Sequence, residues 1–190
     1  MRFHYAGKYN GKEESLPFNE HRLGYVPFKE PDQKTFAILA NAGALGMYIL
    51  TIGIYFLRAR AMLHFGGILL SFVCLVPHEF LHALCFKEDV YMYTYLSKGM
   101  LFVVGPEDMS KKRFIGMSLC PNIVFGLIPF VLFLLHPQWI LLGTFGAFSI
   151  PMGFGDYINV FNAATQMPAN AKTYLHGFHS YWYIPKENEK

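Results

Sequence analysis

The sequence predicts an all-α integral membrane protein with four transmembrane helices and a β-hairpin in its middle loop. Hydrophobic residues make up 53% of the 190 residues and charged residues only 15%, whereas about a quarter of the residues in a typical soluble domain are charged. Four long apolar stretches follow one another, and the loop between the second and the third is rich in β-forming residues. We therefore expect a single membrane domain over residues 1–190.

The four apolar stretches are the predicted transmembrane helices, and they cover residues 36–57, 61–86, 114–135 and 139–164. A helix needs about 20 apolar residues to cross the hydrocarbon of a bilayer. Lipid offers no water to the backbone, so the segments must satisfy their own hydrogen bonds, as helices do. A buried bundle in a soluble protein is the alternative, but four such stretches in one short chain favour the membrane.

The distribution of positive charge predicts how the helices are oriented. Six Lys and Arg residues lie in the N-terminal arm (1–35), five in the middle loop (87–113) and three in the C-terminal tail (165–190). The two short turns on the other side hold two and none. Because Lys and Arg are retained on the cytoplasmic side, we expect a multi-pass protein of the cell membrane with a cytoplasmic arm, loop and tail.

The middle loop and the overall charge add two expectations. Val90–Leu96 and Met100–Val104 are rich in β-forming residues and are separated by Ser97–Gly99, which predicts a β-hairpin. The net charge of +3 is too small to favour nucleic acid as a partner. The expected partners are therefore the lipid bilayer and a protein or peptide within it.

The segment HEFLH contains the residues best suited to bind a metal. His78 and His82 are four residues apart, so on a helix both imidazoles lie on one face and can bind one Zn²⁺. Glu79 lies one residue further round the turn, where it can reach a water molecule beside the metal without being a ligand. The alternative is a pair of core histidines with a glutamate satisfied by a neighbour.

Asp156 is the predicted third ligand. Glu79 and Asp156 are the only acidic residues in the four stretches, which contain no Lys or Arg. Ionisable groups in hydrocarbon are costly unless they are compensated, and a divalent cation would compensate both. His82 and His78 are expected roughly 6–12 Å from the cytoplasmic face and Asp156 roughly 12 Å from it, at 1.5 Å per residue. Two histidines and one carboxylate leave an open position, as in a catalytic zinc site.

Two asparagines in the apolar stretches are candidate substrate-binding residues. Asn122 lies in the third predicted helix and Asn159 in the fourth. Either side chain can bond a substrate backbone or hold a ligand in place. Hydrogen bonding between helices is an equally good explanation for both residues.

Together these residues resemble a family of small zincin-peptidase membrane proteins and, more distantly, the site-2 protease class of intramembrane metalloproteases. The resemblance rests on HEFLH, on the segment from Ser110 to Pro121 and on GDYIN at residues 155–159. Site-2 proteases usually carry an Asp-Gly pair, whereas here glycine precedes Asp156. The resemblance implies that His78, His82 and Asp156 bind zinc and that Glu79 is the catalytic acid and base.

The function expected from the sequence is therefore zinc-dependent hydrolysis of a peptide bond near the cytoplasmic face of the membrane. Two alternatives remain open at this point. A metal-binding scaffold or sensor needs the ligands but not the chemistry of Glu79. A metal or proton transporter is favoured less, because the apolar stretches contain no chain of polar residues that crosses the other half of the membrane.

Overall fold

The chain forms two compact units, and the second, third and fourth predicted spans each contain a boundary between them. The computed structural model describes residues 1–16, 20–95 and 99–186. The first unit comprises residues 1–29, 79–117 and 160–190, and the second comprises residues 30–78 and 118–159.

The second unit is helical. Its elements are α1 (Gln33–Ala59), α2 (Phe65–Val73), the first turn of α3 (Leu75–Leu84), the end of α4 (Lys111–Pro121), the π-helical segment η3 (Asn122–Leu127), α5 (Ile128–Leu135), α6 (Ile140–Met152) and the first part of α7 (Phe154–Gln166). Asp32 caps α1, because its carboxylate accepts hydrogen bonds from the backbone N–H groups of Lys34 and Thr35.

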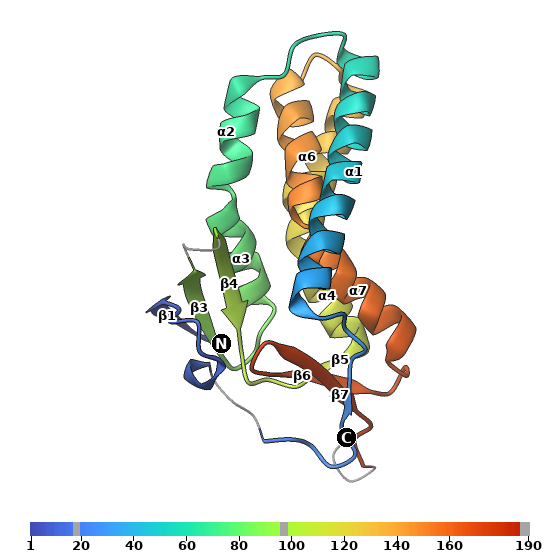
Figure 1. Cartoon of the computed structure of the whole chain (residues 1–190). Coiled ribbons are helices and arrows are strands. Elements are labelled where there is room, and N and C mark those ends of the chain that lie inside the picture. Colours follow the sequence, from blue (N-terminus) through green and yellow to red (C-terminus); the bar gives the residue numbers. More distant parts are fainter. Residues whose placement is uncertain (17–19, 96–98, 187–190) are drawn as a thin grey trace. The chain divides into compact units, whose positions relative to one another are not determined.

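Among the described residues, two helices are long and apolar enough to cross a membrane, Lys34–Ala59 and Lys111–Leu135. They correspond to the first and third predicted spans. The prediction of four continuous spans is not confirmed, because the second span consists of α2 and α3, which meet at a bend of 42° (Figure 1). Pro77 accounts for the bend, since it lacks the N–H that would bond the carbonyl of Val73.

The fourth predicted span is also divided. It begins with α6, a shorter apolar helix that ends at Met152, and continues as α7 from Phe154. Pro151 lies just before the break, where it removes one helical hydrogen bond. Hydropathy is averaged over a window and does not register a missing N–H, so it predicts each of these two segments as one span.

The helices of the second unit pack around a small aromatic core. Tyr55, Phe130, Phe133 and Ala147 form it, and the rings of Tyr55 and Phe133 stack with their centres 5.0 Å apart. A β-carbon on Gly67 would lie 2.7 Å from the carbonyl oxygen of Leu141. Glycine at this position therefore lets α2 and α6 approach backbone to backbone.

The first unit contains two β-sheets, so the prediction of an all-α protein is wrong for this part of the chain. One sheet has the order β1-β3-β4, formed by β1 (Arg2–Lys8), β3 (Asp89–Tyr95) and β4 (Met100–Val104). The other has the order β2-β7-β6-β5, formed by β2 (Val26–Pro27), β7 (His179–Tyr183), β6 (Lys172–His176) and β5 (Met109–Ser110).

The predicted β-hairpin in the middle loop is confirmed. β3 and β4 pair antiparallel, from Tyr91 opposite Val104 to Tyr95 opposite Met100. Part of the connecting turn, residues 96–98, lies outside the described residues. The hairpin also has a partner that was not predicted, because β1 pairs with β3 in parallel.

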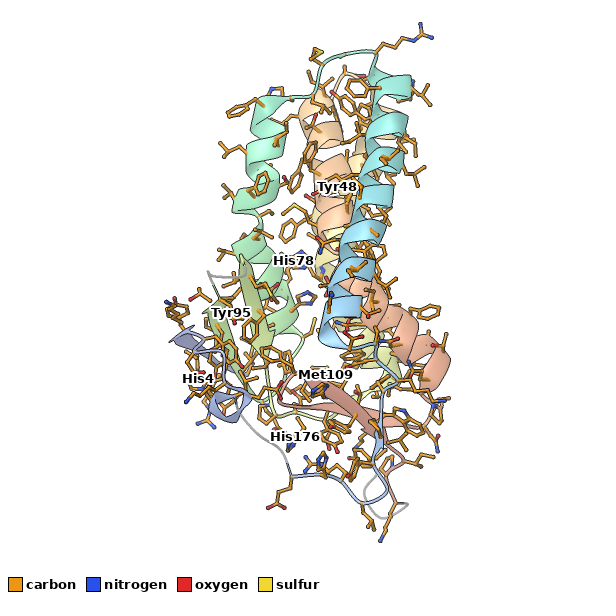
Figure 2. The ribbon with its side chains drawn as sticks, in the orientation of Figure 1. His4, Tyr48, His78, Tyr95, Met109 and His176 are labelled. Carbon is orange, nitrogen blue, oxygen red and sulfur yellow. The ribbon has the colours of Figure 1, made fainter. Side chains whose placement is uncertain are left out.

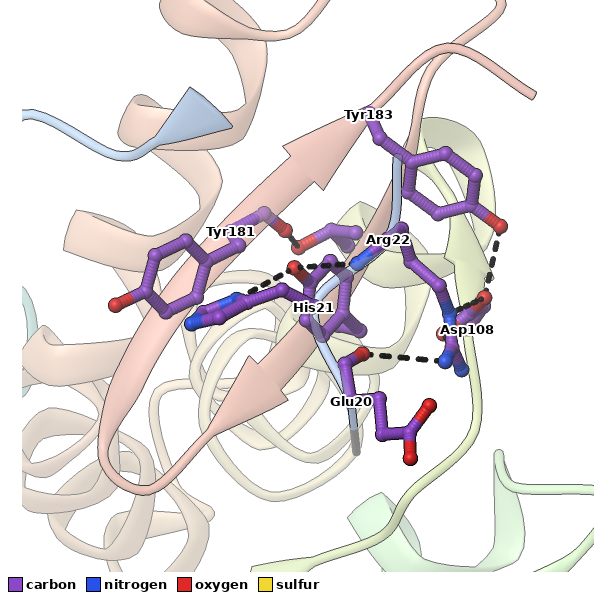
Figure 3. A network of polar contacts seen from close by, with 8 residues as sticks. Glu20, His21, Arg22, Asp108, Tyr181 and Tyr183 are labelled. Carbon is purple, nitrogen blue, oxygen red and sulfur yellow. Dashed lines mark hydrogen bonds and ion pairs between the residues drawn. The ribbon is translucent and has the colours of Figure 1, made fainter. Parts of the chain in front are cut away.

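A polar network ties the N-terminal arm to the second sheet (Figure 3). The guanidinium of Arg22 donates to both carboxylate oxygens of Asp108, at 3.1 and 3.2 Å, and the hydroxyl of Tyr183 donates to the same group at 2.8 Å. The backbone N–H of Arg22 and the ring of His21 both lie within hydrogen-bond distance of the Tyr174 hydroxyl. The bidentate geometry fixes the arm on the sheet more firmly than a single contact would.

A buried ion pair holds the chain just after α3, the helix that carries HEFLH. Arg113 pairs with Glu107 and donates to the carbonyl of Cys85 at 2.6 Å. The other oxygen of Glu107 accepts from the N–H groups of Lys87 and Glu88. Burial alone would raise the pKa of Glu107, but the hydrogen bonds from Arg113 and the two N–H groups outweigh it and hold this pKa below its ordinary value.

The lowered pKa of Glu107 predicts an acid-sensitive contribution to stability. This contribution is fully present when the pH is above the pKa that Glu107 has in the unfolded protein. It is lost as the pH falls through the lower pKa that Glu107 has in the folded protein. Glu107→Gln leaves a largely buried Arg113 without its anion, so we expect a loss of about 3 kcal/mol at pH 7 and a weaker decline of stability towards pH 3. Thermal unfolding in detergent across this pH range measures both effects.

Glu88→Gln is the matched control for this prediction, because Glu88 is exposed and neighbours the same turn. It should leave the melting temperature at pH 7 unchanged. Equal melting temperatures for Glu107→Gln and Glu88→Gln would contradict the structural role of the ion pair.

Candidate metal centre

The HEFLH residues lie on α3 with their metal-binding atoms close together. One candidate ligand atom each of His78, Glu79 and His82 lies within 4.8 Å of the other two. The helix begins at Leu75, three residues before His78, so the motif is helical over its whole length. Figure 2 labels His78 on this helix. The expected spacing of the two imidazoles on one helical face is therefore confirmed.

His82 is held by a backbone carbonyl of the same unit. Its side chain is buried, and its Nδ1 lies 3.0 Å from the carbonyl oxygen of Met117. A carbonyl oxygen only accepts hydrogen bonds, so Nδ1 must carry the hydrogen. Nε2 is then the unprotonated ring nitrogen, the form of nitrogen that binds a metal. Histidine ligands of metals usually donate their other ring N–H to a carbonyl or a carboxylate in this way.

His78 meets Asp156 inside the second unit. Nε2 of His78 lies 3.2 Å from Oδ2 of Asp156, and each side chain is 17% exposed. Two atoms bound to one tetrahedral zinc at 2.0–2.1 Å are separated by about 3.3 Å. The spacing of this pair therefore fits a shared ion, and it brings together two residues that the sequence analysis assigned to one site.

Asn122 fixes the carboxylate of Asp156. Its Nδ2 donates to Oδ2 of Asp156 at 2.8 Å and to the carbonyl of Ser118 at 3.0 Å. Both partners only accept, so the orientation of the amide is determined. The side-chain oxygen of Asn122 is buried and has no hydrogen-bond partner among the described residues. The structure thus places Asn122 on a candidate ligand.

Asn159, the other predicted substrate-binding residue, lies on α7 three residues after Asp156. Its side chain is half-buried, and it makes no hydrogen bond to the described part of the chain. It therefore lies on the helix of Asp156, and no hydrogen bond among the described residues links it to the candidate metal-binding side chains.

A small cavity adjoins His78 in the second unit. Its volume is about 10 Å³, close to the smallest space that holds one water molecule. It is lined by Ser71, Cys74, Leu75, His78, Phe125, Ser149 and Met152. The hydroxyl of Ser149 is buried and has no partner among the described residues, so a water molecule in the cavity would satisfy it.

Sequence reasoning missed two contributors to this centre and the role of a third residue. The carbonyl of Met117 and the hydroxyl of Ser149 give no signal in the sequence, because each acts through a contact that only the fold creates. Gly153 gives a weak one, as a glycine three residues before the acidic ligand candidate. A β-carbon at this position would lie 1.5 Å from the Asn122 side-chain oxygen, so glycine makes room for the amide.

Two histidines four residues apart on a helix, with a glutamate directly after the first, are the pattern that zinc metallopeptidases use. Residues 71–172, more than half of the chain, match a family described as "Putative zincin peptidase". The chain belongs to this family, as the resemblance drawn from its motifs predicted. No curated protein and no solved structure matches the chain.

The space at Gly153 gives a prediction that does not depend on function. Its φ of −82° is open to any residue, so only the contact with Asn122 requires glycine. Gly153→Ala must displace the amide from Asp156, and we expect a loss of about 1–3 kcal/mol from overpacking. Thermal unfolding in detergent measures it.

Gly155→Ala is the matched control, since nothing lies within 4 Å of a β-carbon at that position. It should be neutral or stabilise α7 by up to about 1 kcal/mol. If the two alanine variants unfold at the same temperature, the amide is not confined as described.

Proposed function

We propose that this protein is a zinc-dependent intramembrane peptidase that hydrolyses a peptide bond near the cytoplasmic face of the membrane. The observation that carries the proposal is the contact between His78 Nε2 and Asp156 Oδ2 at 3.2 Å. The two residues are 78 positions apart in the sequence, and apolar helices bring them together. Membership of the zincin family supports the same chemistry.

The proposed zinc ligands are His78, His82 and Asp156. The donor set suits zinc, which binds imidazole nitrogen and carboxylate oxygen in catalytic sites with one position left open. The partly buried setting supports a bound dication, because an ionised carboxylate such as Asp156 is costly among apolar helices and a dication would compensate its charge. With its hydrogen on Nδ1, the imidazole of His82 has Nε2 as its unprotonated nitrogen, the form that binds a metal.

Bound zinc supplies a Lewis acid that polarises a carbonyl oxygen and lowers the pKa of water towards about 7. Glu79 is the proposed general base and acid. Its carboxylate belongs to the group within 4.8 Å on α3, so it lies within reach of a water molecule beside the two imidazoles. It would take the proton of the attacking water and return it to the leaving amine.

The proposed substrate is a membrane protein or peptide. Two of the described helices are long and apolar enough to cross a membrane, so the protein is suited to meet substrates within lipid. We place both termini and the middle loop in the cytoplasm, because 14 of the 16 Lys and Arg residues lie in these segments. On this topology the HEFLH motif lies towards the cytoplasmic end of its span, in the cell membrane.

The two alternative functions make different demands on the same residues. A scaffold or sensor would bind zinc through the same ligands and would not depend on the carboxylate of Glu79. A transporter would move zinc or protons across vesicles. Each alternative is therefore an outcome of the experiments below.

The ligand assignment predicts the metal content of the purified protein. We expect about one zinc per chain, retained after dialysis, and its loss in both His82→Ala and Asp156→Asn. Elemental analysis of detergent-purified protein measures it. His136→Ala is the control, because His136 is exposed at the turn after α5. Full zinc retention in Asp156→Asn would show that another group, with Glu79 the nearest candidate, is the third ligand.

The role of Glu79 predicts a separation of binding from activity. Glu79→Gln should keep its zinc and lose hydrolysis by about 10²–10⁴-fold, the usual contribution of a general base. Cleavage of a quenched fluorescent peptide library in detergent micelles measures the activity. Zinc binding without any hydrolysis by the unaltered protein would favour the scaffold, and zinc flux in sealed vesicles would favour the transporter.

A further inference from the structure

The helix from Lys111 to Leu135 changes from α-helical to π-helical directly after a proline. Pro121 closes α4, is fully buried and is followed directly by the π-helical segment η3. A proline has no N–H, so the carbonyl four residues earlier loses its helical partner, and the ring pushes against that carbonyl. In α4 the released carbonyl belongs to Met117.

The carbonyl released by Pro121 is the one that holds His82. Nδ1 of His82 lies 3.0 Å from the Met117 oxygen, and both residues belong to the first unit. With an N–H at position 121, the same oxygen would have a helical donor competing with the imidazole. The proline thus reserves an acceptor for the histidine.

The same arrangement occurs a second time in the chain. Pro151 releases the carbonyl of Ala147, and the hydroxyl of Thr51 lies 2.8 Å from that oxygen, within the second unit. Two released carbonyls, those of Met117 and Ala147, thus lie beside side-chain donors from other helices. Thr51 joins two helices in this way, whereas His82 is a proposed zinc ligand.

The residue after Pro121 contacts another of the proposed ligands, Asp156. Asn122 begins η3, and its amide donates to Asp156 and to the carbonyl of Ser118, all within the second unit. Two consecutive residues at one helix break are thus linked to two different ligands, each through a contact inside a single unit. π-helical turns of this kind are frequent at functional sites.

We infer that Pro121 and Asn122 form one positioning element for the metal centre. Pro121 sets the tautomer and direction of His82 by freeing the carbonyl of Met117, and Asn122 sets the direction of the Asp156 carboxylate. The inference rests on the proposed function in so far as His82 and Asp156 bind zinc. The link between Pro121 and His82 is independent of any metal.

The test compares Pro121→Ala with the unaltered full-length protein in detergent. Loss of such outer partners typically weakens metal binding by 10–100-fold, so we expect the zinc dissociation constant to rise by at least about 10-fold. Competition with a chromophoric chelator measures it. Pro129→Ala is the matched control: it adds an N–H to the same helix, and the carbonyl four residues before it belongs to Phe125.

A second readout separates positioning from general damage to the fold. In metal-free protein with ¹⁵N-labelled histidine rings, NMR should show His82 with its hydrogen on Nδ1. Pro121→Ala should shift His82 towards a mixture of tautomers, and Pro129→Ala and Asn122→Ala should not. Asn122→Ala should nevertheless weaken zinc binding, because it acts on Asp156.

The outcomes distinguish this inference from the proposed function. If the unaltered protein binds zinc and Pro121→Ala binds it equally tightly with an unchanged His82 tautomer, the positioning role is refuted and the proposed ligands stand. If no variant binds zinc, the proposed function fails, and the tautomer still decides whether Pro121 controls His82. Pro121→Val, which better fills the space of the ring, replaces Pro121→Ala if that variant does not fold.

Discussion

The site depends on the contacts that hold the Asp156 carboxylate among apolar helices. An ionised carboxylate in such surroundings costs several kcal/mol unless it is compensated, and the four predicted spans offer no Lys or Arg to neutralise it. The carboxylate contacts the imidazole of His78 and the amide of Asn122. Gly153 admits that amide because any larger residue would collide with it. The position of Asp156 thus constrains the identity of its neighbours in α3 and η3 and at the junction of α6 with α7.

The functional side chains lie at helix breaks, and proline accounts for each break. His78 follows Pro77, Asn122 follows Pro121, and Asp156 lies five residues after Pro151. A proline in a helix interior costs about 3 kcal/mol relative to alanine, so Pro121 and Pro151, which lie inside helices, lower the local stability. The released carbonyls and widened turns offset part of this cost through contacts such as His82 with Met117. Continuous helices would have satisfied their backbone internally and left no acceptor for these side chains.

The parts of the site that sequence alone predicted are those set by local geometry or by an unusual charge. The spacing of His78 and His82 needs only a helix, and Asp156 stood out as an acid in an apolar stretch. The sheets of the first unit were predicted only in part. β6 and β7 form a hairpin whose two-residue turn begins at Gly177 with φ of +62°, a signal the sequence does contain. The parallel pairing of β1 with β3 joins residues about 87 positions apart, and no local pattern encodes it.

The segment that matches the family, residues 71–172, contains every residue proposed to bind zinc, to transfer protons or to position a ligand. It does not contain α1, although α1 contacts α6, one of the helices that position the site. Thr51 of α1 lies beside the carbonyl that Pro151 releases on Ala147, and this carbonyl belongs to the helix that ends just before Gly153. Gly153 packs against the amide of Asn122, and this amide donates to Asp156. A shift of α1 against α6 would therefore be passed to Asp156 through these two contacts. The residues proposed to carry the chemistry therefore all lie in the segment that matches the family. The geometry of the site also depends on the packing of α1, which lies outside that segment.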